Sequence, residues 1–252
     1  MTSEQTILDL QKMLERERIS KEIYAELNQF VDFKNTLTAV LSKFKEISKC
    51  EAVSIRLHNA GDYPYYVYDG FDDSFICQEN ELCARDEYGE KQTEYDAVKG
   101  EEVLVLDCMC GNVIRGRIDP SLTFFTEGGS FWSNNTSELL STTTSEELQA
   151  ETRNECNSAG YKSVALIPIR TKNEIVGLIQ LNDKRNDMFS EDFIEFMEVI
   201  AQQLGIAIQN SIAYTKLLST QQAIEGVLDL VNSQVQAKID LAEKHPMHKP
   251  CK

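Results

Sequence analysis

The sequence predicts an α+β fold in which an antiparallel sheet is flanked by long helices at both ends of the chain. Two observations support this fold class. Apolar residues recur at helical spacing over residues 4–49 and again over residues 190–243. Between these regions, residues 50–187 contain short apolar or alternating runs, several of them joined by turn residues. The chain has 252 residues, which is enough to bury a sizeable core.

The first 49 residues are predicted to be helical, with a break near Asp32. No glycine or proline occurs before Gly61, so nothing else interrupts the helical spacing. After residue 31 the apolar stripe becomes broader, which suits packing on a sheet. Its members are Leu37, Val40, Leu41, Phe44 and Ile47.

The middle region is predicted to contain two hairpins. Residues 51–58 alternate between apolar and polar, as in a half-buried strand, and residues 65–68 follow after a turn at Gly61. Residues 163–170 and 174–181 are two apolar runs joined by a three-residue turn. Pro168 indicates an edge position or a bulge in the first of these runs, because proline cannot donate to a sheet ladder.

Two cysteines, Cys108 and Cys110, follow the apolar run 103–106, which we interpret as a strand. In a strand, residues i and i+2 point to the same face, so the two thiols would project together. Such a pair suits metal ligation, redox chemistry or attachment of a cofactor. The alternative is that both are small apolar core residues, as free cysteines often are.

Residues 190–243 form the long C-terminal helix of this prediction, with Ser190 as N-cap and an acidic first turn. From Ala207 onward, alternating steps of three and four residues indicate the heptad register of a coiled coil. The positions are Ala207, Asn210, Tyr214, Leu217, Gln221, Ile224, Leu228, Val231 and Val235. We expect a homodimer through this helix and the N-terminal helix. Folding of the helix back onto its own domain is the alternative.

Composition excludes several classes of function. With 41 acidic and 25 basic residues, the net charge of −16 would repel a phosphate backbone, so we expect no nucleic-acid partner. No run of about 18 apolar residues occurs, and the first residues lack the features of a signal peptide. We therefore expect no membrane partner and a cytoplasmic location. The odd count of seven cysteines argues against a framework of structural disulfides in that setting.

Three segments carry a resemblance to a known family. Residues 163–169 read SVALIPI, residues 175–182 read IVGLIQLN, and residues 189–192 read FSED. In this order they resemble the closing signature of the GAF domain, a small-molecule sensor module of histidine kinases, phosphodiesterases and transcription activators. The resemblance covers about residues 31–214. It implies a central antiparallel sheet with helices on one face and a ligand pocket on the other.

Further segments, residues 108–117, 126–135 and 152–161, are similar to a cysteine-rich sub-group of GAF domains in sensor histidine kinases of bacteria and methanogenic archaea. The resemblance implies a small-molecule pocket between the sheet and the loops before the last two strands. Gly128 and Gly129 in these loops permit close approach of the backbone to a ligand. Trp132 forms a pocket wall or simply covers the sheet. The pocket candidates are Arg115, Arg117, Glu127, Trp132, Asn134 and Arg153.

Five cysteines inside this region are candidates for holding a cofactor, although their spacing matches no standard zinc ribbon or ferredoxin pattern. They are Cys77, Cys83, Cys108, Cys110 and Cys156. The first four are also the candidate metal ligands. Soft thiolates favour haem iron, an iron–sulfur cluster or zinc. We interpret His58 as a strand residue, and we place His245, His248 and Cys251 in a tail.

The prediction divides the chain into a coiled-coil helix (1–30), a sensory domain (31–213), a second coiled-coil helix (214–243) and a disordered tail (244–252). The favoured function is that of a redox- or gas-sensing module, which binds a small ligand or a thiolate-held cofactor and signals to a histidine kinase or another partner. The alternatives are an enzyme resembling free methionine-(R)-sulfoxide reductases and a ligand-free dimerisation adaptor. The enzyme is less favoured, because the histidine-containing strand motif of those reductases has no counterpart before Cys108.

Overall fold

The computed structural model describes residues 3–28, 32–97, 100–144, 153–172 and 174–244. The chain forms two compact units, residues 1–208 and residues 209–252. The domain boundary expected at residues 30 and 31 and the tail after residue 244 lie outside the described residues.

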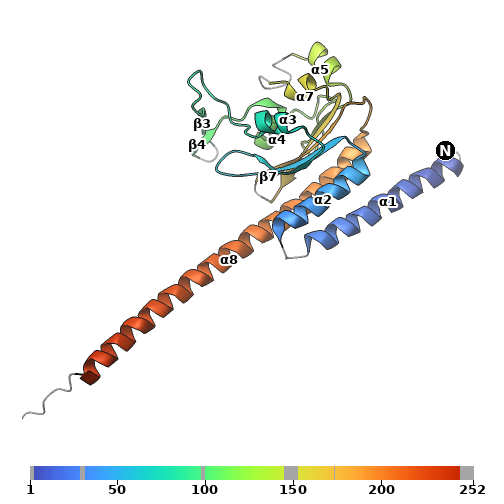
Figure 1. Ribbon diagram of the computed structural model, residues 1–252. Helices are drawn as coiled ribbons and strands as arrows, with labels where there is room; N and C mark the ends of the chain where they lie inside the picture. The colour runs from blue at the N-terminus through green and yellow to red at the C-terminus, as the bar shows by residue number, and fades with distance from the viewer. Residues whose placement is uncertain (1–2, 29–31, 98–99, 145–152, 173, 245–252) are drawn as a thin grey trace, which may run out of the picture. The chain divides into compact units, whose positions relative to one another are not determined.

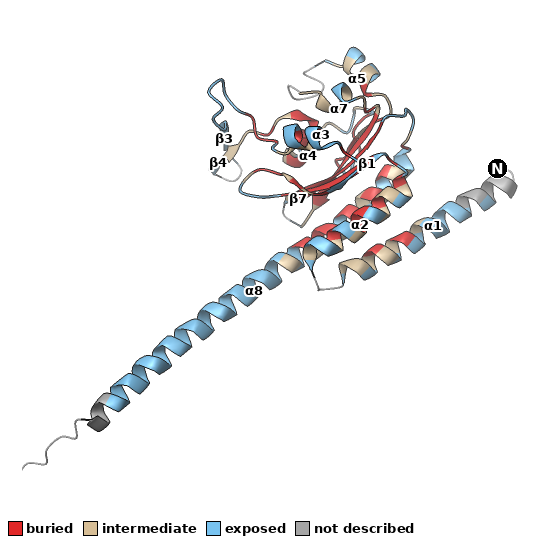
Figure 2. Cartoon of the chain, in the orientation of Figure 1, coloured by how far each residue is buried: buried red, intermediate tan, exposed pale blue. Residues whose placement is uncertain are grey.

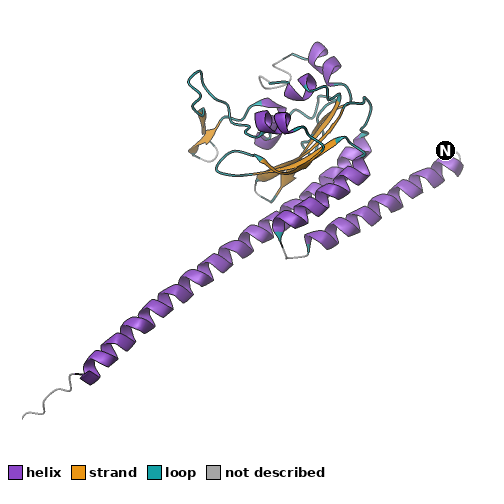
Figure 3. Cartoon of the chain, viewed as in Figure 1, coloured by secondary structure: helices purple, strands orange, loops and turns teal. Residues whose placement is uncertain are grey.

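The chain has long helices at both ends and a strand-rich middle (Figures 1 and 3). The helices are α1 (Ser3–Leu27), α2 (Phe33–Ser48), α3 (Asp73–Glu79), α4 (Cys108–Arg115), α5 (Thr136–Thr142), α7 (Glu155–Ser158) and α8 (Glu191–Lys244). The strands are β1 (Ala52–Leu57), β2 (Tyr65–Asp69), β3 (Thr93–Asp96), β4 (Glu101–Leu104), β5 (Phe131–Ser133), β6 (Ser163–Arg170) and β7 (Ile175–Asp183).

A five-stranded antiparallel sheet in the order β2-β1-β7-β6-β5 forms the centre of the first unit, and β3 and β4 make a separate pair. This confirms the predicted fold class and both predicted hairpins. The pairing of β5 with β6 runs from Ser133 to Phe131, opposite Val164 to Leu166. Pro168 therefore lies beyond the end of β5, where the missing N–H removes no bond to that strand.

One face of the sheet is covered by α2 and the first part of α8, and α1 packs against these two helices. Their apolar side chains meet those of β1, β6 and β7 in the larger core cluster, seen as buried segments on α2 and the sheet in Figure 2. The predicted break at Asp32 is confirmed. Its carboxylate accepts hydrogen bonds from the backbone N–H groups of Lys34 and Asn35, which caps α2.

The opposite face is covered by α3, α4, α5, α7 and their loops, which form a second core cluster with the sheet. The predicted strand at residues 51–58 is present as β1, but the prediction that it is half-buried was wrong. Every residue of β1 is buried, including Ser54 and Arg56. Because a layer of helices and loops covers this face, the polar half of the alternating pattern lies in the interior instead of in solvent. His58 follows the strand and is exposed.

The segment around the two neighbouring cysteines is a helix, not the predicted strand. β4 ends at Leu104, and α4 begins at Cys108, whose φ of 66° lies in the left-handed region. The apolar side chains of α4 recur at helical spacing and face the second core cluster. Gly111 lies so close to Leu106, two residues beyond the end of β4, that an added Cβ would be 2.6 Å from the Leu106 carbonyl oxygen.

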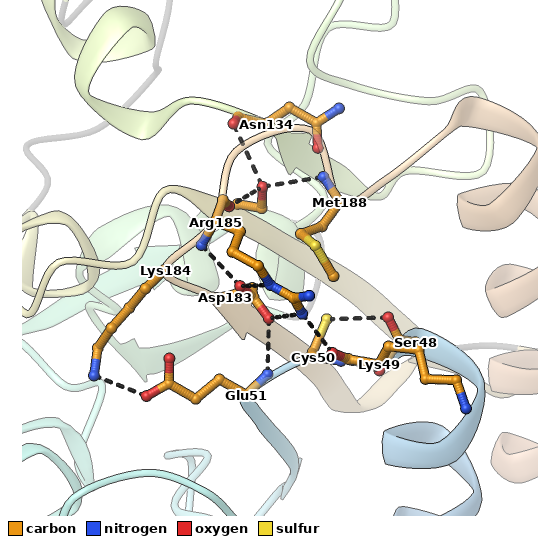
Figure 4. Close-up of polar contacts among 10 residues, drawn as sticks. Ser48, Lys49, Cys50, Glu51, Asn134, Asp183, Lys184, Arg185 and Met188 are labelled. Atoms are coloured by element: carbon orange, nitrogen blue, oxygen red, sulfur yellow. Dashed lines mark hydrogen bonds and ion pairs between the residues drawn. The ribbon is translucent and has the colours of Figure 1, made fainter.

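A polar junction joins the end of α2, the start of β1 and the end of β7 (Figure 4). The buried Asp183 carboxylate accepts hydrogen bonds from Arg185 and from the backbone N–H of Glu51. Arg185 also donates to the carbonyl oxygen of Lys49 at 2.7 Å. Burial raises the pKa of Asp183, but the hydrogen bonds from Arg185 and the backbone outweigh it, so the net pKa is lowered.

The helix α8 begins as predicted at Ser190, whose hydroxyl accepts a hydrogen bond from the N–H of Phe193. Beyond residue 208 it belongs to the second unit, where its apolar side chains are exposed. They include Ile212, Tyr214, Leu217, Ile224, Val227, Leu228, Leu230, Val231, Val235 and Ile239. Among the helices of the described chain, none combines the length and the apolar character needed to cross a membrane.

Candidate functional site

A small cavity of about 60 Å³ lies on the face of the sheet opposite α2. Side chains from α4, α5, α7, β5 and β6 form its wall. They are Cys108, Met109, Cys110, Phe131, Thr136, Leu139, Leu140, Asn154, Cys156, Asn157, Val164 and Leu166. Three of the five predicted cysteines, far apart in the sequence, therefore share one cavity, which we call the thiol cavity.

Cys108 and Cys110 interact directly in this cavity although they lie on a helix. The hydrogen bond from the Cys110 thiol lowers the pKa of Cys108 to about 7, against the opposing effect of burial. The same interaction, with burial, raises the pKa of Cys110 well above its ordinary value. One proton is therefore lost readily from the pair, and the second is held. A thiolate is the nucleophilic and metal-binding form of cysteine, so Cys108 is the reactive member.

Cys156 enters the cavity from α7 and connects it to a buried polar network. The Gln180 side-chain amide donates to the Cys156 sulfur at 3.6 Å and to Asn182 at 3.2 Å. The side-chain oxygen of Gln180, Oε1, accepts a hydrogen bond from the Tyr65 hydroxyl at 3.2 Å. Burial raises the pKa of Cys156 to about 12, so this thiol stays protonated near neutrality.

Arg56 is the fully buried cation of this network. Its guanidinium donates to the carbonyl oxygens of Tyr63 at 2.9 Å and Asn80 at 3.2 Å, and to that of Glu79. The charge also lies 3.5 Å from the centre of the Tyr65 ring. The sequence analysis did not select Arg56 or Gln180. Their signal was present, because Arg56 is a polar residue of the alternating run 51–58 and Gln180 is a polar residue inside the apolar run 174–181.

A second, larger cavity of about 510 Å³ is polar and open. We call it the outer cavity. Its wall consists of Cys77, Gln78, Asn80, Glu81, Cys83, Arg85, Asp107 and Arg153. The structure thus divides the predicted cysteines into two groups, and the proposed metal set of Cys77, Cys83, Cys108 and Cys110 is not brought together. Arg153, a predicted pocket residue, forms an ion pair with Glu79 at 3.6 Å in this wall.

The other predicted pocket residues have contacts within the protein. The guanidinium groups of Arg115 and Arg117 donate to the carbonyl oxygens of Leu104 and Leu106. Glu127 is exposed. Trp132 packs against the larger core cluster, on the face of the sheet that α2 and α8 cover. The Asn134 side chain exchanges two hydrogen bonds with the backbone of Phe189, at 2.8 and 2.9 Å.

The Gly128–Gly129 turn approaches protein groups closely. Gly129 has a φ of 87°, as expected for a glycine turn. A Cβ on Gly128 would meet the carboxylate of Glu198 on α8, and one on Gly129 would meet the guanidinium of Arg170. The same Glu198 carboxylate accepts hydrogen bonds from the hydroxyls of Thr126 and Ser130. The two glycines therefore bring this loop against α8.

The size of the thiol cavity decides which expected cofactors fit it. Pockets for organic ligands and cofactors measure about 300–1,000 Å³, so haem is far larger than the 60 Å³ present. Zinc in a structural site needs four ligands about 2.0–2.3 Å from the ion. Among the described residues, the group with three ligand atoms within 4.8 Å of one another contains Cys83 but none of the thiols of this cavity. The cavity suits a small molecule or chemistry of the thiols themselves.

Comparison with known proteins identifies the family. The model of the GAF domain matches residues 32–208, so the chain belongs to the GAF domain family. A search among curated proteins finds no match.

Solved structures of low identity share the fold. The GAF domain of a phosphoenolpyruvate-protein phosphotransferase from Coxiella burnetii has a TM-score of 0.52 and 15% identity, covering 81% of this chain and 98% of that one. The corresponding domain from Acinetobacter has the same TM-score and identity, covering 80% and 98%. A free methionine-R-sulfoxide reductase from Neisseria meningitidis, in complex with its substrate, has a TM-score of 0.50 and 9% identity, covering 79% and 91%. Similarity at these identities concerns the fold alone.

Proposed function

We propose that this GAF domain is a sensory module in which the thiol cavity is the sensing site for a small oxidant or thiol-reactive ligand. The observation that carries the proposal is the meeting of Cys108, Cys110 and Cys156 in one cavity, with the pKa of Cys108 lowered to about 7. A buried thiol with no reactive role ordinarily has a raised pKa. Cys50, in the other core cluster, has that behaviour, since burial raises its pKa to about 11.

Reaction with a peroxide illustrates the chemistry of sensing. The Cys108 thiolate attacks one peroxide oxygen, an S–O bond forms, the O–O bond breaks, and the departing oxygen leaves as water after taking up a proton. The resulting sulfenic acid condenses with a second thiol of the cavity, which forms a disulfide and releases a second water. The two cysteines are oxidised and the peroxide is reduced. A cellular thiol reductant would restore the resting state.

Two hydrogen-bonded links support transmission from the cavity to α8. Phe131 lines the cavity, and its neighbour Ser130 donates to Glu198 of α8 at 2.6 Å. At the other end of β5, the Asn134 side chain forms hydrogen bonds with the backbone of Phe189 just before α8 begins. A change in the cavity that moves Phe131 therefore pulls on the first turns of α8 from both ends of β5.

The output in this proposal is a homodimer formed through the terminal helices. The heptad positions of α8 after residue 208 carry exposed apolar side chains, such as Leu217 at 64% and Leu228 at 54% exposure. An apolar stripe at this spacing is the usual seam of a two-stranded coiled coil. We propose a histidine kinase or another signalling protein as the receiver.

The test begins with absorption and metal analysis of protein purified without oxygen, followed by peroxide at increasing concentration and mapping of the oxidised cysteines by mass spectrometry. We expect Cys108 to be modified first, and the modification of the cavity thiols to disappear in Cys108→Ser. Cys50→Ser is the matched control and should leave the reaction unchanged. Equal reactivity of Cys108 and Cys50, or a haem band in the purified protein, would refute the proposal.

A second candidate function is a reductase of free methionine-(R)-sulfoxide. The observation that favours it is a thiol of lowered pKa beside further thiols in the cavity, since such an enzyme needs an attacking and a resolving cysteine. Turnover of free methionine-(R)-sulfoxide with a thiol reductant, lost in Cys108→Ser, would establish it. A ligand-free adaptor, in contrast, would remain the same dimer whether or not its thiols were modified.

A further inference from the structure

Three potential metal ligands meet outside the thiol cavity. One ligand atom each from Asp62, Glu81 and Cys83 lies within 4.8 Å of the other two. Asp62 stands in the turn between β1 and β2, while Glu81 and Cys83 follow α3. The main chain holds this arrangement, because Oδ1 of Asp62 accepts from the N–H groups of Tyr63 at 2.7 Å and Leu82 at 2.9 Å.

The other carboxylate oxygen of Asp62, Oδ2, lacks a hydrogen-bond partner among the described residues. The Asp62 residue is only 5% exposed, and Oδ2 is buried without a hydrogen-bond partner in the described part of the chain. Its neighbour in the cluster is the Cys83 thiol, a weak donor. Burying a charged carboxylate oxygen without a compensating partner is strongly unfavourable. A cation at this position would supply the compensation.

We propose that Asp62, Glu81 and Cys83 form a binding site for a divalent metal ion, Zn²⁺ by the chemistry of the ligands. One thiolate and two carboxylates are among the ligand types that zinc accepts. In a tetrahedral site with ligand distances of about 2.0–2.3 Å, neighbouring ligand atoms are about 3.5 Å apart. Since the ligand atoms lie within 4.8 Å of one another, each separation has to contract by about 1.3 Å at most. The exposed side chain of Glu81 is free to make that movement, since it is 47% exposed.

The surrounding charges are compatible with the ion. Three anionic ligands around Zn²⁺ leave a net charge of −1, and Arg85 and Lys91 already lie against Glu81. Both are exposed ion pairs, which contribute little to stability and rearrange easily. Glu81 and Cys83 line the outer cavity, so the fourth position of the ion faces that space, where Cys77 also stands. This site is independent of the thiol cavity and of the sensing proposal.

The experiment is a titration of the reduced, metal-free full chain with Zn²⁺ in competition with a chromophoric chelator. Co²⁺ substitution provides a second readout, because a sulfur ligand gives an intense charge-transfer absorption. We expect one equivalent of bound metal, and a loss of affinity of at least about tenfold in Cys83→Ser and in Glu81→Gln. Asp62→Asn retains the Oδ1 acceptor for the two backbone N–H groups and should lose affinity as well.

Cys108→Ser is the matched control, since it removes a thiol of the other cavity and should leave the stoichiometry and affinity unchanged. Glu81→Gln alters an exposed side chain, so the test stands even if Asp62→Asn fails to fold. The proposal is overturned if the protein binds no Zn²⁺ at micromolar concentration. It is also overturned if Cys83→Ser and Glu81→Gln bind as well as the unaltered chain, or if the cobalt absorption disappears in Cys108→Ser.

Discussion

Removal of the Cys110 thiol should raise the pKa of Cys108. The hydrogen bond from Cys110 is the largest influence that lowers this pKa to about 7, and burial is the largest one that raises it. In Cys110→Ala the lowering influence is lost while the burial remains. The pKa of Cys108 should therefore return to the unshifted thiol value, about 9, or exceed it.

The size of the effect follows from the shift. A pKa of about 7 makes roughly half of the Cys108 side chains thiolate at pH 7, whereas a pKa of 9, the unshifted value, makes about one in a hundred. The rate of reaction of Cys108 with a small alkylating reagent at pH 7 should thus fall about fiftyfold.

The assay measures the ultraviolet absorbance of the thiolate against pH, as a difference between each protein and its Cys108→Ser counterpart. Alkylation rates of the Cys108 peptide, followed by mass spectrometry, give a second readout. Cys110→Ser is the matched control, because its hydroxyl still donates a hydrogen bond in a side chain of similar size. The reasoning fails if Cys110→Ala titrates at the same pH as the unaltered protein, or if Cys110→Ser loses the shift equally.

Three further predictions concern stability, each measured by urea unfolding. Arg56→Met should lower the free energy of unfolding by about 3 kcal/mol, because buried carbonyl oxygens lose their charged donor. Asp183→Asn should be destabilising at neutral pH, and the difference should shrink below about pH 4, since the stability from a lowered carboxyl pKa is complete above the unfolded pKa and is lost as the pH falls through the folded pKa. Gly205→Ala should destabilise by about 1–3 kcal/mol although alanine favours helices, because its Cβ would lie 1.9 Å from the Arg170 carbonyl oxygen. Gly226→Ala, where a Cβ meets nothing within 4 Å, is the matched control and should lose no stability.

Local signals in the sequence were sufficient for the helices at both ends of the chain and for the two hairpins. The capping carboxylate of Asp32 and the hydroxyl of Ser190 mark helix starts through hydrogen bonds to residues two or three positions away. The hairpin of β6 and β7 depends on a short turn between two apolar runs. Because the interactions involved are close in sequence, the residue types alone predict them. The GAF signature of the last two strands likewise consists of contiguous residues.

The sequence misassigned the segment that begins at Cys108, and the reason is physical. A short apolar run fits a buried strand or a buried helix equally well, and periodicity over so few residues does not separate them. Tertiary contacts decided between a strand and a helix for this segment. Met109, Cys110 and Val113 find partners in the second core cluster only when the segment is helical.

By itself, the sequence determined the fold class, the family, the terminal helices and the two hairpins, because those depend on local propensity and on contiguous motifs. Only the tertiary structure decided which cysteines meet, since Cys156 and Cys108 are brought together by packing of α7 and α4 on one face of the sheet. It also decided that Arg56 is buried, because a polar residue on an alternating strand faces solvent or interior according to whether another layer covers it. The burial of a strand face and the meeting of two cysteines both depend on residues distant in the chain, so no local sequence pattern predicts them.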